Sequence, residues 1–365
     1  MIEQIWVRNF RCFEDVSINF VDRPSCLIIG KNGSGKSTLR HVLAILQQLS
    51  RSPRRTREWV RLADFTEIGF DHPMRFGIEA VVEQKRFRYE IELRWPEDGT
   101  EAKITEEVLK IDDFPAFIRN PLGLVTGDSR LGLDGHIAAF SVVGDRQGDN
   151  SIQEFKSFLD SMILVAPAPN RMSGYSKAED SDLAQDASNI GSWLSRQLKR
   201  APTARAMIDS YLAGVFLDFH AFDFKSVGRD EQQLFVTFKD EGGPRSRAID
   251  FADLSDGEKC FFLAAAILAA NRTSGPIMCF WDEPDSHLSL SEVHHFIVHL
   301  RRMTNQNGQL IATSHSPKTI RSFSDENTLV FTRDSHLSTT VVRSLDEFSY
   351  RGDLIEALAR EEIIG

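Results

Sequence analysis

The sequence predicts an α/β fold built around a largely parallel sheet. Residues 26–30 (CLIIG) and 277–281 (IMCFW) are continuous apolar runs, a pattern typical of strands that are buried on both faces. From residue 251 onward, such strand-like runs alternate with helical segments, of which 290–303 is the clearest amphipathic example. This alternation favours an α/β layer in which helices cover the sheet.

Composition indicates a soluble protein with a large core, because 41% of the 365 residues are hydrophobic. The net charge of −10 gives no support for a protein that coats nucleic acid, although a local basic patch could still bind it. The cysteines form no C-x-x-C pair, which favours buried thiols in a reducing compartment. No signal-peptide pattern opens the chain, and its longest apolar run, 261–270, is about half a membrane span. We therefore expect a cytoplasmic protein with no membrane partner.

Three parts are expected along the chain. Residues 1–100 contain short β-rich segments and the alternating run 85–95, so they should form an antiparallel β subdomain beside the first buried strand. Residues 101–250 mix helical patterns with polar loops, which we interpret as an inserted, largely helical region. Residues 251–365 supply the remaining strands and helices of the α/β layer.

Residues 30–37 (GKNGSGKS) match the phosphate-binding pattern G-x-x-x-x-G-K-[ST] and lie between a buried strand and a helix, as that motif requires. Glycines permit backbone angles and a close approach to phosphate that a Cβ would prevent. Backbone amides at the start of the helix then bind phosphate oxygens, and Lys36 reaches the β- and γ-phosphates. The predicted nucleotide-binding residues are Gly30, Lys31, Asn32, Gly33, Ser34, Gly35, Lys36, Ser37 and Thr38.

Four polar residues follow the second apolar run: Asp282, Glu283, Asp285 and His287. They could form a nuclease metal site, a catalytic group that uses the histidine, or the acidic end of a nucleotide-binding strand. The phosphate loop favours the third interpretation, since such a loop works with an acidic residue at the end of a neighbouring strand. Asp282 and Ser37 are then the predicted Mg²⁺ ligands, and Glu283 is the general base for the attacking water. No role is predicted for His287.

Two further motifs complete a pattern. LSDGEK (254–259) resembles the signature motif of ABC-type ATPases, and TSHSP (313–317) resembles their His switch. DSHLS (285–289) lies where such proteins have the D-loop. The opening IWVRNFRCF resembles the start of SMC, RecF and OLD-type ATPases, and the whole set is most similar to the RecF/OLD-like branch of AAA-type ATPases. The resemblance covers 1–95 and 250–335 and implies an ABC-type ATPase head with ATP and Mg²⁺ as cofactors.

The resemblance also implies individual roles. The signature residues would face ATP bound by the opposite subunit, namely Ser255, Asp256, Gly257 and Glu258. His315 would sense the γ-phosphate and act in catalysis together with Glu283 and Lys36. Asp285 would communicate across the dimer, and Arg11 would lie near the nucleotide. The implied protein is an ATPase that forms an ATP-dependent homodimer or a higher assembly.

The sequence departs from this family in two places. No Q-loop glutamine is evident, and in the segment 63–70 Asp64, Thr66 or Glu67 could take its place. OLD-type proteins continue into a TOPRIM nuclease domain, whereas too few residues follow His315 for one. We therefore expect an ATP-dependent switch without a nuclease of its own, which controls a separate effector such as a nuclease in anti-phage defence.

The alternative is a RecF-like ATPase that binds nucleic acid directly in DNA repair. Five arginines bear on this choice, because they could form either a phosphate-contacting patch or a solvated loop: Arg51, Arg54, Arg55, Arg57 and Arg61.

Three histidines lie off the apolar stripe of the helix 290–303, which favours a solvated face over a metal pair: His294, His295 and His299. An ATP-binding scaffold without turnover is disfavoured by Glu283, and a transporter subunit is the weakest interpretation.

Overall fold

The computed structural model describes residues 1–69, 71–145, 148–240, 245–306, 308–349, 353–360 and 363. The chain separates into two compact units. The first unit comprises Met1–Met162 and Ser324–Gly365, and the second comprises Ile163–Phe323. None of the helices in the described ranges combines the length and the apolar character that a membrane span requires.

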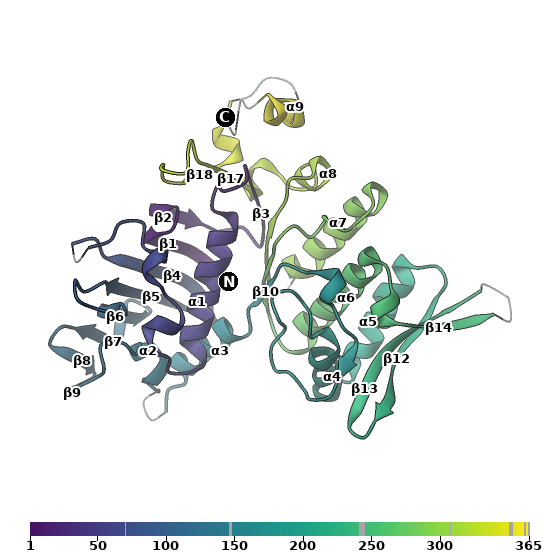
Figure 1. Ribbon diagram of the computed structural model, residues 1–365, viewed down its shortest axis with the longest axis horizontal. Helices are drawn as coiled ribbons and strands as arrows, with labels where there is room; N and C mark the ends of the chain where they lie inside the picture. The colour runs from purple at the N-terminus through teal and green to yellow at the C-terminus, as the bar shows by residue number, and fades with distance from the viewer. Residues whose placement is uncertain are drawn as a thin grey trace. The chain divides into compact units, whose positions relative to one another are not determined.

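An antiparallel sheet of eight strands dominates the first unit (Figure 1), in the order β2-β1-β4-β5-β6-β7-β8-β9. The strands are β1 Ile2–Phe10, β2 Phe13–Asn19, β4 Met74–Val82, β5 Lys85–Arg94, β6 Lys103–Ile111, β7 Phe114–Asn120, β8 Gly123–Thr126 and β9 Ser129–Leu131. The alternation predicted for 85–95 is confirmed, because Phe87, Tyr89 and Ile91 are fully buried. Phe87 stacks on Phe155 with ring centroids 4.8 Å apart, so this face of β5 packs on helix α3 (Ser151–Asp160).

The first unit also contains the strand that precedes the phosphate loop. Strand β3 (Ser25–Gly30) pairs in parallel with β17 (Thr328–Thr332), and β18 (Val341–Ser344) pairs antiparallel with β17. The helices are α1 Lys36–Arg51, α2 Ala139–Val142, α3 Ser151–Asp160 and α9 Leu354–Ala359. The predicted stripe of α1 is confirmed, since all its members are buried: Leu39, Val42, Leu43, Ile45 and Leu46.

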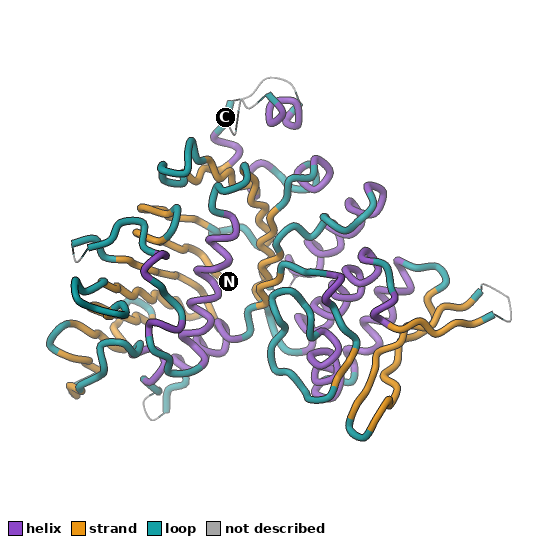
Figure 2. The backbone as a smooth tube through the Cα atoms, in the orientation of Figure 1, coloured by secondary structure: helices purple, strands orange, loops and turns teal. Residues whose placement is uncertain are grey.

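Parallel strands and a buried helix form the second unit. Strands β10 (Ile163–Val165), β15 (Met278–Trp281) and β16 (Gln309–Thr313) pair in parallel in the order β10-β15-β16. The helices are α4 Ile190–Arg200, α5 Thr203–Val215, α6 Asp256–Thr273, α7 Leu290–Gln306 and α8 Pro317–Ile320. Four further strands, β11 Tyr175–Ser176, β12 Phe219–Gly228, β13 Glu231–Lys239 and β14 Ser246–Asp250, form an antiparallel sheet. Its β12–β13 hairpin extends beyond the helices of this unit (Figure 2).

Helix α6 explains the longest apolar run of the sequence. Its residues from Lys259 to Asn271 are all buried, and α4, α5 and α7 pack against it. On one side, Phe261 meets Phe296 of α7 edge to face at 5.0 Å. The run is therefore the core helix of an α/β unit, because it is surrounded by protein on all sides.

Helix α7 confirms the solvated histidine face. Val293, Phe296, Ile297 and Leu300 are buried, whereas His294, His295 and His299 are exposed. The predicted stripe also included Met303, whose side chain lies outside the described residues. The thiol prediction is confirmed as well, because the cysteines are free and buried. Burial raises the pKa of Cys279 to about 12, so this thiol stays protonated at neutral pH.

The segment expected as an inserted region belongs to both units. Strands β6 to β9 extend the antiparallel sheet of the first unit, whereas α4, α5 and β11 to β14 belong to the second. The expected boundaries of 1–100, 101–250 and 251–365 stay a prediction. The α/β class, the parallel strand pairing and the antiparallel β subdomain are confirmed.

Candidate functional site

The phosphate loop connects β3 to α1 in the first unit and depends on glycine geometry. Gly30, Gly33 and Gly35 have φ angles of +157°, +81° and +105°. A Cβ on Gly30 would lie 2.3 Å from the carbonyl oxygen of Phe331, and a Cβ on Gly35 would lie 2.6 Å from the ring of Phe13. The loop therefore needs glycine for its backbone angles at all three positions and for close packing at the first and third.

Lys36 folds back over the loop that precedes it. Its Nζ donates to the carbonyl oxygens of Gly30 at 2.7 Å and Lys31 at 3.1 Å, and the residue is buried. Gly35 is the N-cap of α1 without a side-chain cap, and the first turn contains no acidic residue. Ser34 Oγ is buried and lacks a hydrogen-bond partner among the described residues. An uncapped helix N-terminus beside a buried, unpaired hydroxyl fits the phosphate chain of a nucleotide.

Arg11 lies in the turn between β1 and β2. Its Nε donates to Asp64 Oδ1 at 2.9 Å, and its guanidinium lies 3.3 Å from Nε2 of His41 on α1. Burial acts to raise the pKa of Asp64, yet hydrogen bonds from the backbone of Arg61 and the side chain of Arg11 hold this pKa below its usual range. Arg11 therefore has a carboxylate partner in the segment where a Q-loop was expected.

The other two Q-loop candidates are held differently. Thr66 Oγ1 donates to the carbonyl oxygen of Arg11 at 2.8 Å, and the backbone N–H of Glu67 donates to Asn9 Oδ1 at 2.7 Å. Residue 70, the last of the expected segment, lies outside the described residues. Of the three candidates, Asp64 is the one whose carboxylate is joined to Arg11, so it is the best candidate for a link between this segment and the phosphate loop.

Asp282 and Glu283 follow β15 in the second unit. Thr313, at the end of the neighbouring strand β16, donates from Oγ1 to Asp282 Oδ1 at 2.5 Å and accepts the backbone N–H of Glu283 at 3.0 Å. Glu283 has a φ of +50°, a left-handed conformation that costs a non-glycine residue about 1–3 kcal/mol. The fully buried Thr313 thus fixes both acidic residues and helps to hold a strained backbone.

Thr313 was not predicted as a site residue, although the sequence contained a signal for it. It opens TSHSP at the carboxyl end of a strand, and such ends meet at one edge of a parallel sheet. We expect Thr313→Val to lower the free energy of unfolding by about 1–3 kcal/mol, because it removes a hydrogen bond from each acidic residue. Urea denaturation measures this loss, and ATP hydrolysis should fall with it.

Matched substitutions separate the hydroxyl from the shape of the side chain. Thr313→Ser keeps the hydroxyl and should retain most of the stability and activity. Thr332→Val makes the same change at the end of β17, where the hydroxyl makes a long contact of 3.5 Å to the carbonyl oxygen of Val341. Equal urea midpoints for Thr313→Val and wild type would rule out the bridging role.

His315 lies next to the predicted general base. Its Nε2 is 3.7 Å from Glu283 Oε1, and both side chains are nearly half exposed. Ser286 Oγ donates to the other carboxylate oxygen of Glu283 at 2.8 Å. The structure therefore brings two of the three predicted catalytic residues together at the carboxyl ends of the neighbouring strands β15 and β16, where both are partly exposed.

The side chain of Asp285 is directed into its own unit. It is buried, and its Oδ2 accepts hydrogen bonds from Ser314 Oγ and Thr319 Oγ1, each at 2.6 Å. These partners lie in the TSHSP loop and in α8, directly after it. Asp285 thus ties the D-loop to the loop that carries His315, a contact that the sequence did not predict.

His287 also has a neighbour. Its Nδ1 lies 3.8 Å from Asp256 Oδ2, and a Cβ on Gly257 would lie 3.2 Å from its carbonyl oxygen. The D-loop therefore contacts the signature segment at one end and the TSHSP loop at the other. A side chain at position 257 would press against this carbonyl oxygen and require it to shift slightly.

The signature segment begins helix α6. Ser255 is the N-cap: its Oγ accepts the N–H of Glu258 at 3.3 Å, and Glu258 Oε2 accepts the N–H of Ser255 at 2.7 Å. This reciprocal pair is a capping box, which assigns Glu258 a structural role. Ser255 and Asp256 are exposed. The positive end of the α6 dipole therefore lies at the surface of the second unit.

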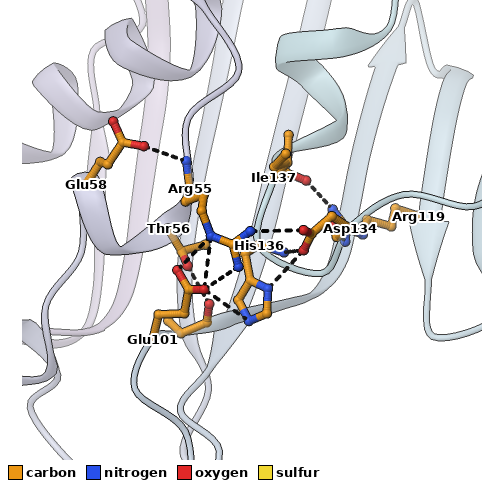
Figure 3. A network of polar contacts seen from close by, with 9 residues as sticks. Arg55, Thr56, Glu58, Glu101, Arg119, Asp134, His136 and Ile137 are labelled. Atoms are coloured by element: carbon orange, nitrogen blue, oxygen red, sulfur yellow. Dashed lines mark hydrogen bonds and ion pairs between the residues drawn. The ribbon is translucent and has the colours of Figure 1, made fainter.

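Most of the predicted arginine patch is neutralised by carboxylates. Figure 3 shows Arg55 between Glu101 and Asp134, with His136 beside both acids. Arg51 pairs with Asp160 at 2.5 Å, and Arg61 lies 3.4 Å from Asp64. Arg54 and Arg57 are exposed. Three of the five arginines therefore have carboxylate partners within the first unit, which weakens the case for a phosphate-contacting patch.

A phosphate loop on an α/β fold, together with an acidic pair after a buried parallel strand, defines the class of P-loop ATPases. The family model described as "AAA domain, putative AbiEii toxin, Type IV TA system" matches residues 26–321. The chain belongs to this family. None of the curated proteins matches it.

Solved structures of SMC heads share the fold. A head bound to the C-winged helix domain of ScpA matches with a TM-score of 0.59 and 15% identity, over 95% of this chain and 99% of that one. A head with an extended coiled coil, bound to the C-terminal domain of ScpA derived from Pyrococcus furiosus, matches with 0.51 and 15%, over 99% of each chain. The SMC head domain from Thermotoga maritima matches with 0.50 and 13%, over 94% and 98%. At these identities the likeness shows the fold alone.

Proposed function

We propose that the protein is an ATP-dependent switch, in which two copies close over two ATP molecules and reopen after hydrolysis. The observation that carries this proposal is the exposed start of α6. Ser255 and Asp256 lie at a positive helix end that is directed away from the core of their own unit. Such a surface suits the γ-phosphate of a nucleotide held by a second copy. Because that contact needs the γ-phosphate, ATP favours the closed dimer and ADP does not.

In the proposed reaction, the loop from Gly30 to Thr38 binds the phosphates and Lys36 neutralises charge on the transferred group. Mg²⁺, for which Ser37 and Asp282 are the proposed ligands, would supply further charge neutralisation when bound. Glu283 accepts the proton of the attacking water, and His315 orients that water. Thr313 and Ser286 hold Glu283 in position for this step.

We further propose that closure controls a separate effector in anti-phage defence. The family description names a toxin of a toxin–antitoxin system, and two of the similar SMC heads are bound to a domain of another protein. Both facts support a separate protein partner. Direct nucleic-acid binding in DNA repair is the weaker candidate, because the arginines of 51–61 are mostly ion-paired.

Size-exclusion chromatography with light scattering tests the dimer. Glu283→Gln should trap ATP and elute as a dimer at micromolar concentration, and the same protein with ADP should elute as a monomer. Ser255→Asp keeps a good N-cap but places a negative charge against the γ-phosphate, so adding it to Glu283→Gln should abolish the dimer. Ser274→Asp, at the other end of α6, is the matched control. A monomer of Glu283→Gln with ATP would exclude the switch.

A further inference from the structure

Two side chains from the C-terminal part of the first unit donate hydrogen bonds to carbonyl oxygens of the phosphate loop. Arg333 donates from one guanidinium nitrogen to the carbonyl oxygen of Gly33 at 3.2 Å. Thr340 donates from Oγ1 to the carbonyl oxygen of Ser34 at 2.9 Å. These two residues are about 300 positions away from the loop in the chain. Arg333 and Thr340 are the first and last residues of the connection between β17 and β18, which we call the clamp segment (333–340).

Strand pairing brings the clamp segment to this place. In β17, Phe331 is the register partner of Gly30, the last residue of β3. Because Phe331 lies beside Gly30, the chain leaves β17 next to the start of the phosphate loop. Arg333 is the first residue after the strand. The parallel pairing of β3 and β17 therefore determines which residues reach the loop.

The clamp segment is itself braced. Arg333 Nε donates to the carbonyl oxygen of Ser338 at 2.8 Å. The guanidinium therefore links the two ends of the clamp segment and also contacts Gly33. The backbone N–H of Thr340 donates to the carbonyl oxygen of Cys12 at 3.0 Å, and Thr340 is 2% exposed. Thr340 thus joins the β1–β2 turn to the phosphate loop, and neither contact depends on a mobile surface side chain.

Holding these carbonyl groups fixes the amides that would bind phosphate. A peptide unit is planar and trans, so the C=O of one residue and the N–H of the next point in opposite directions. Lys36 Nζ anchors the carbonyls of Gly30 and Lys31, and Leu39 N–H donates to that of Gly35. Thr340 anchors the Ser34 carbonyl and thereby orients the N–H of Gly35, the N-cap of α1.

We propose that Arg333 and Thr340 are positioning residues for nucleotide binding, which preset the phosphate loop by holding its carbonyl groups. Arg333 also adds a positive charge beside the loop, which attracts phosphate. This inference rests on the proposed nucleotide site but not on hydrolysis or dimer formation. Binding of ADP to the monomer therefore tests it separately from the switch.

Isothermal titration calorimetry with ADP and Mg²⁺ gives the decisive measurement. Thr340→Val and Arg333→Gln should each weaken ADP binding by about 3- to 10-fold, since each removes one hydrogen bond that holds the loop in its binding geometry. Thr340→Ser retains the hydroxyl and should restore wild-type affinity. The matched controls are Thr339→Val in the same segment and Arg343→Gln on β18, and both should bind ADP as wild type does.

Steady-state kinetics distinguishes loop positioning from a general loss of structure. In both clamp variants KM for ATP should rise while kcat at saturating ATP changes less than about twofold, because bound ATP restores the loop geometry. Thermal unfolding confirms that each variant folds. If Thr340→Val does not fold, the ADP affinity of Arg333→Gln decides the question. Affinity within twofold of wild type for the folded variants would overturn the proposal. So would an equal loss in Thr340→Ser and Thr340→Val.

Discussion

Replacing Glu283 with glutamine should lower the rate of ATP hydrolysis by about 10²- to 10⁴-fold, the usual contribution of a general base. Glutamine has almost the same shape, so the hydrogen bonds of its backbone to Thr313 and of its side chain to Ser286 can persist. What disappears is the ability to accept a proton from water. Phosphate release under single-turnover conditions measures the loss, and ATP affinity should remain within about threefold of wild type.

A control for this experiment is Glu97→Gln, the same chemical change at an exposed glutamate in the loop between β5 and β6. It should hydrolyse ATP at the wild-type rate. A Glu283→Gln rate within tenfold of wild type would assign the proton transfer to another group. His315, at 3.7 Å from the carboxylate, would then be the first residue to test.

Replacing Lys36 with alanine should weaken ATP binding by about 100-fold or more. Two effects combine, because the ammonium group would bind phosphate and also holds the carbonyl oxygens of Gly30 and Lys31. Hydrogen bonds to a charged group contribute about 1.5–3 kcal/mol each, so the loss of two is large. Equilibrium binding of a fluorescent ATP analogue measures the change.

Two comparisons sharpen the lysine experiment. Lys36→Arg keeps the charge but replaces a compact ammonium with a planar fork, so it should recover only part of the affinity. Lys110→Ala removes an exposed lysine from β6 and should bind the analogue as wild type does. Wild-type affinity in Lys36→Ala would exclude the phosphate loop as the main nucleotide contact.

Local patterns in the sequence predicted much of this structure. The glycine spacing of GKNGSGKS anticipated the positive φ angles, because few other residues tolerate them. The apolar stripes of α1 and α7 and the alternation in β5 were visible as periodicity. Even the contact between Thr313 and Asp282 could have been predicted, because Asp282 follows one predicted parallel strand and Thr313 ends another.

Most other contacts between polar residues that are distant in the chain could not be predicted. Arg55 pairs with Glu101 and Asp134, and no periodicity connects the loop after α1 with the segments that carry these acids. The role of Asp285 across a dimer stays a prediction, and the contacts of its carboxylate with two hydroxyl groups of its own unit were not predicted. The direction of a short polar side chain depends on which loops fold next to it, and hydrophobic patterning does not encode this.

In the proposed mechanism, the left-handed backbone of Glu283 sets the stability of the fold against the rate of ATP hydrolysis at one position. A glycine there would adopt a φ of +50° without steric cost and would relieve the strain, but it would remove the carboxylate. Selection for a more stable fold and selection for turnover would therefore favour different residues at position 283. On the proposed mechanism, a protein of this fold that did not hydrolyse ATP could accept glycine at position 283, whereas one that did could not.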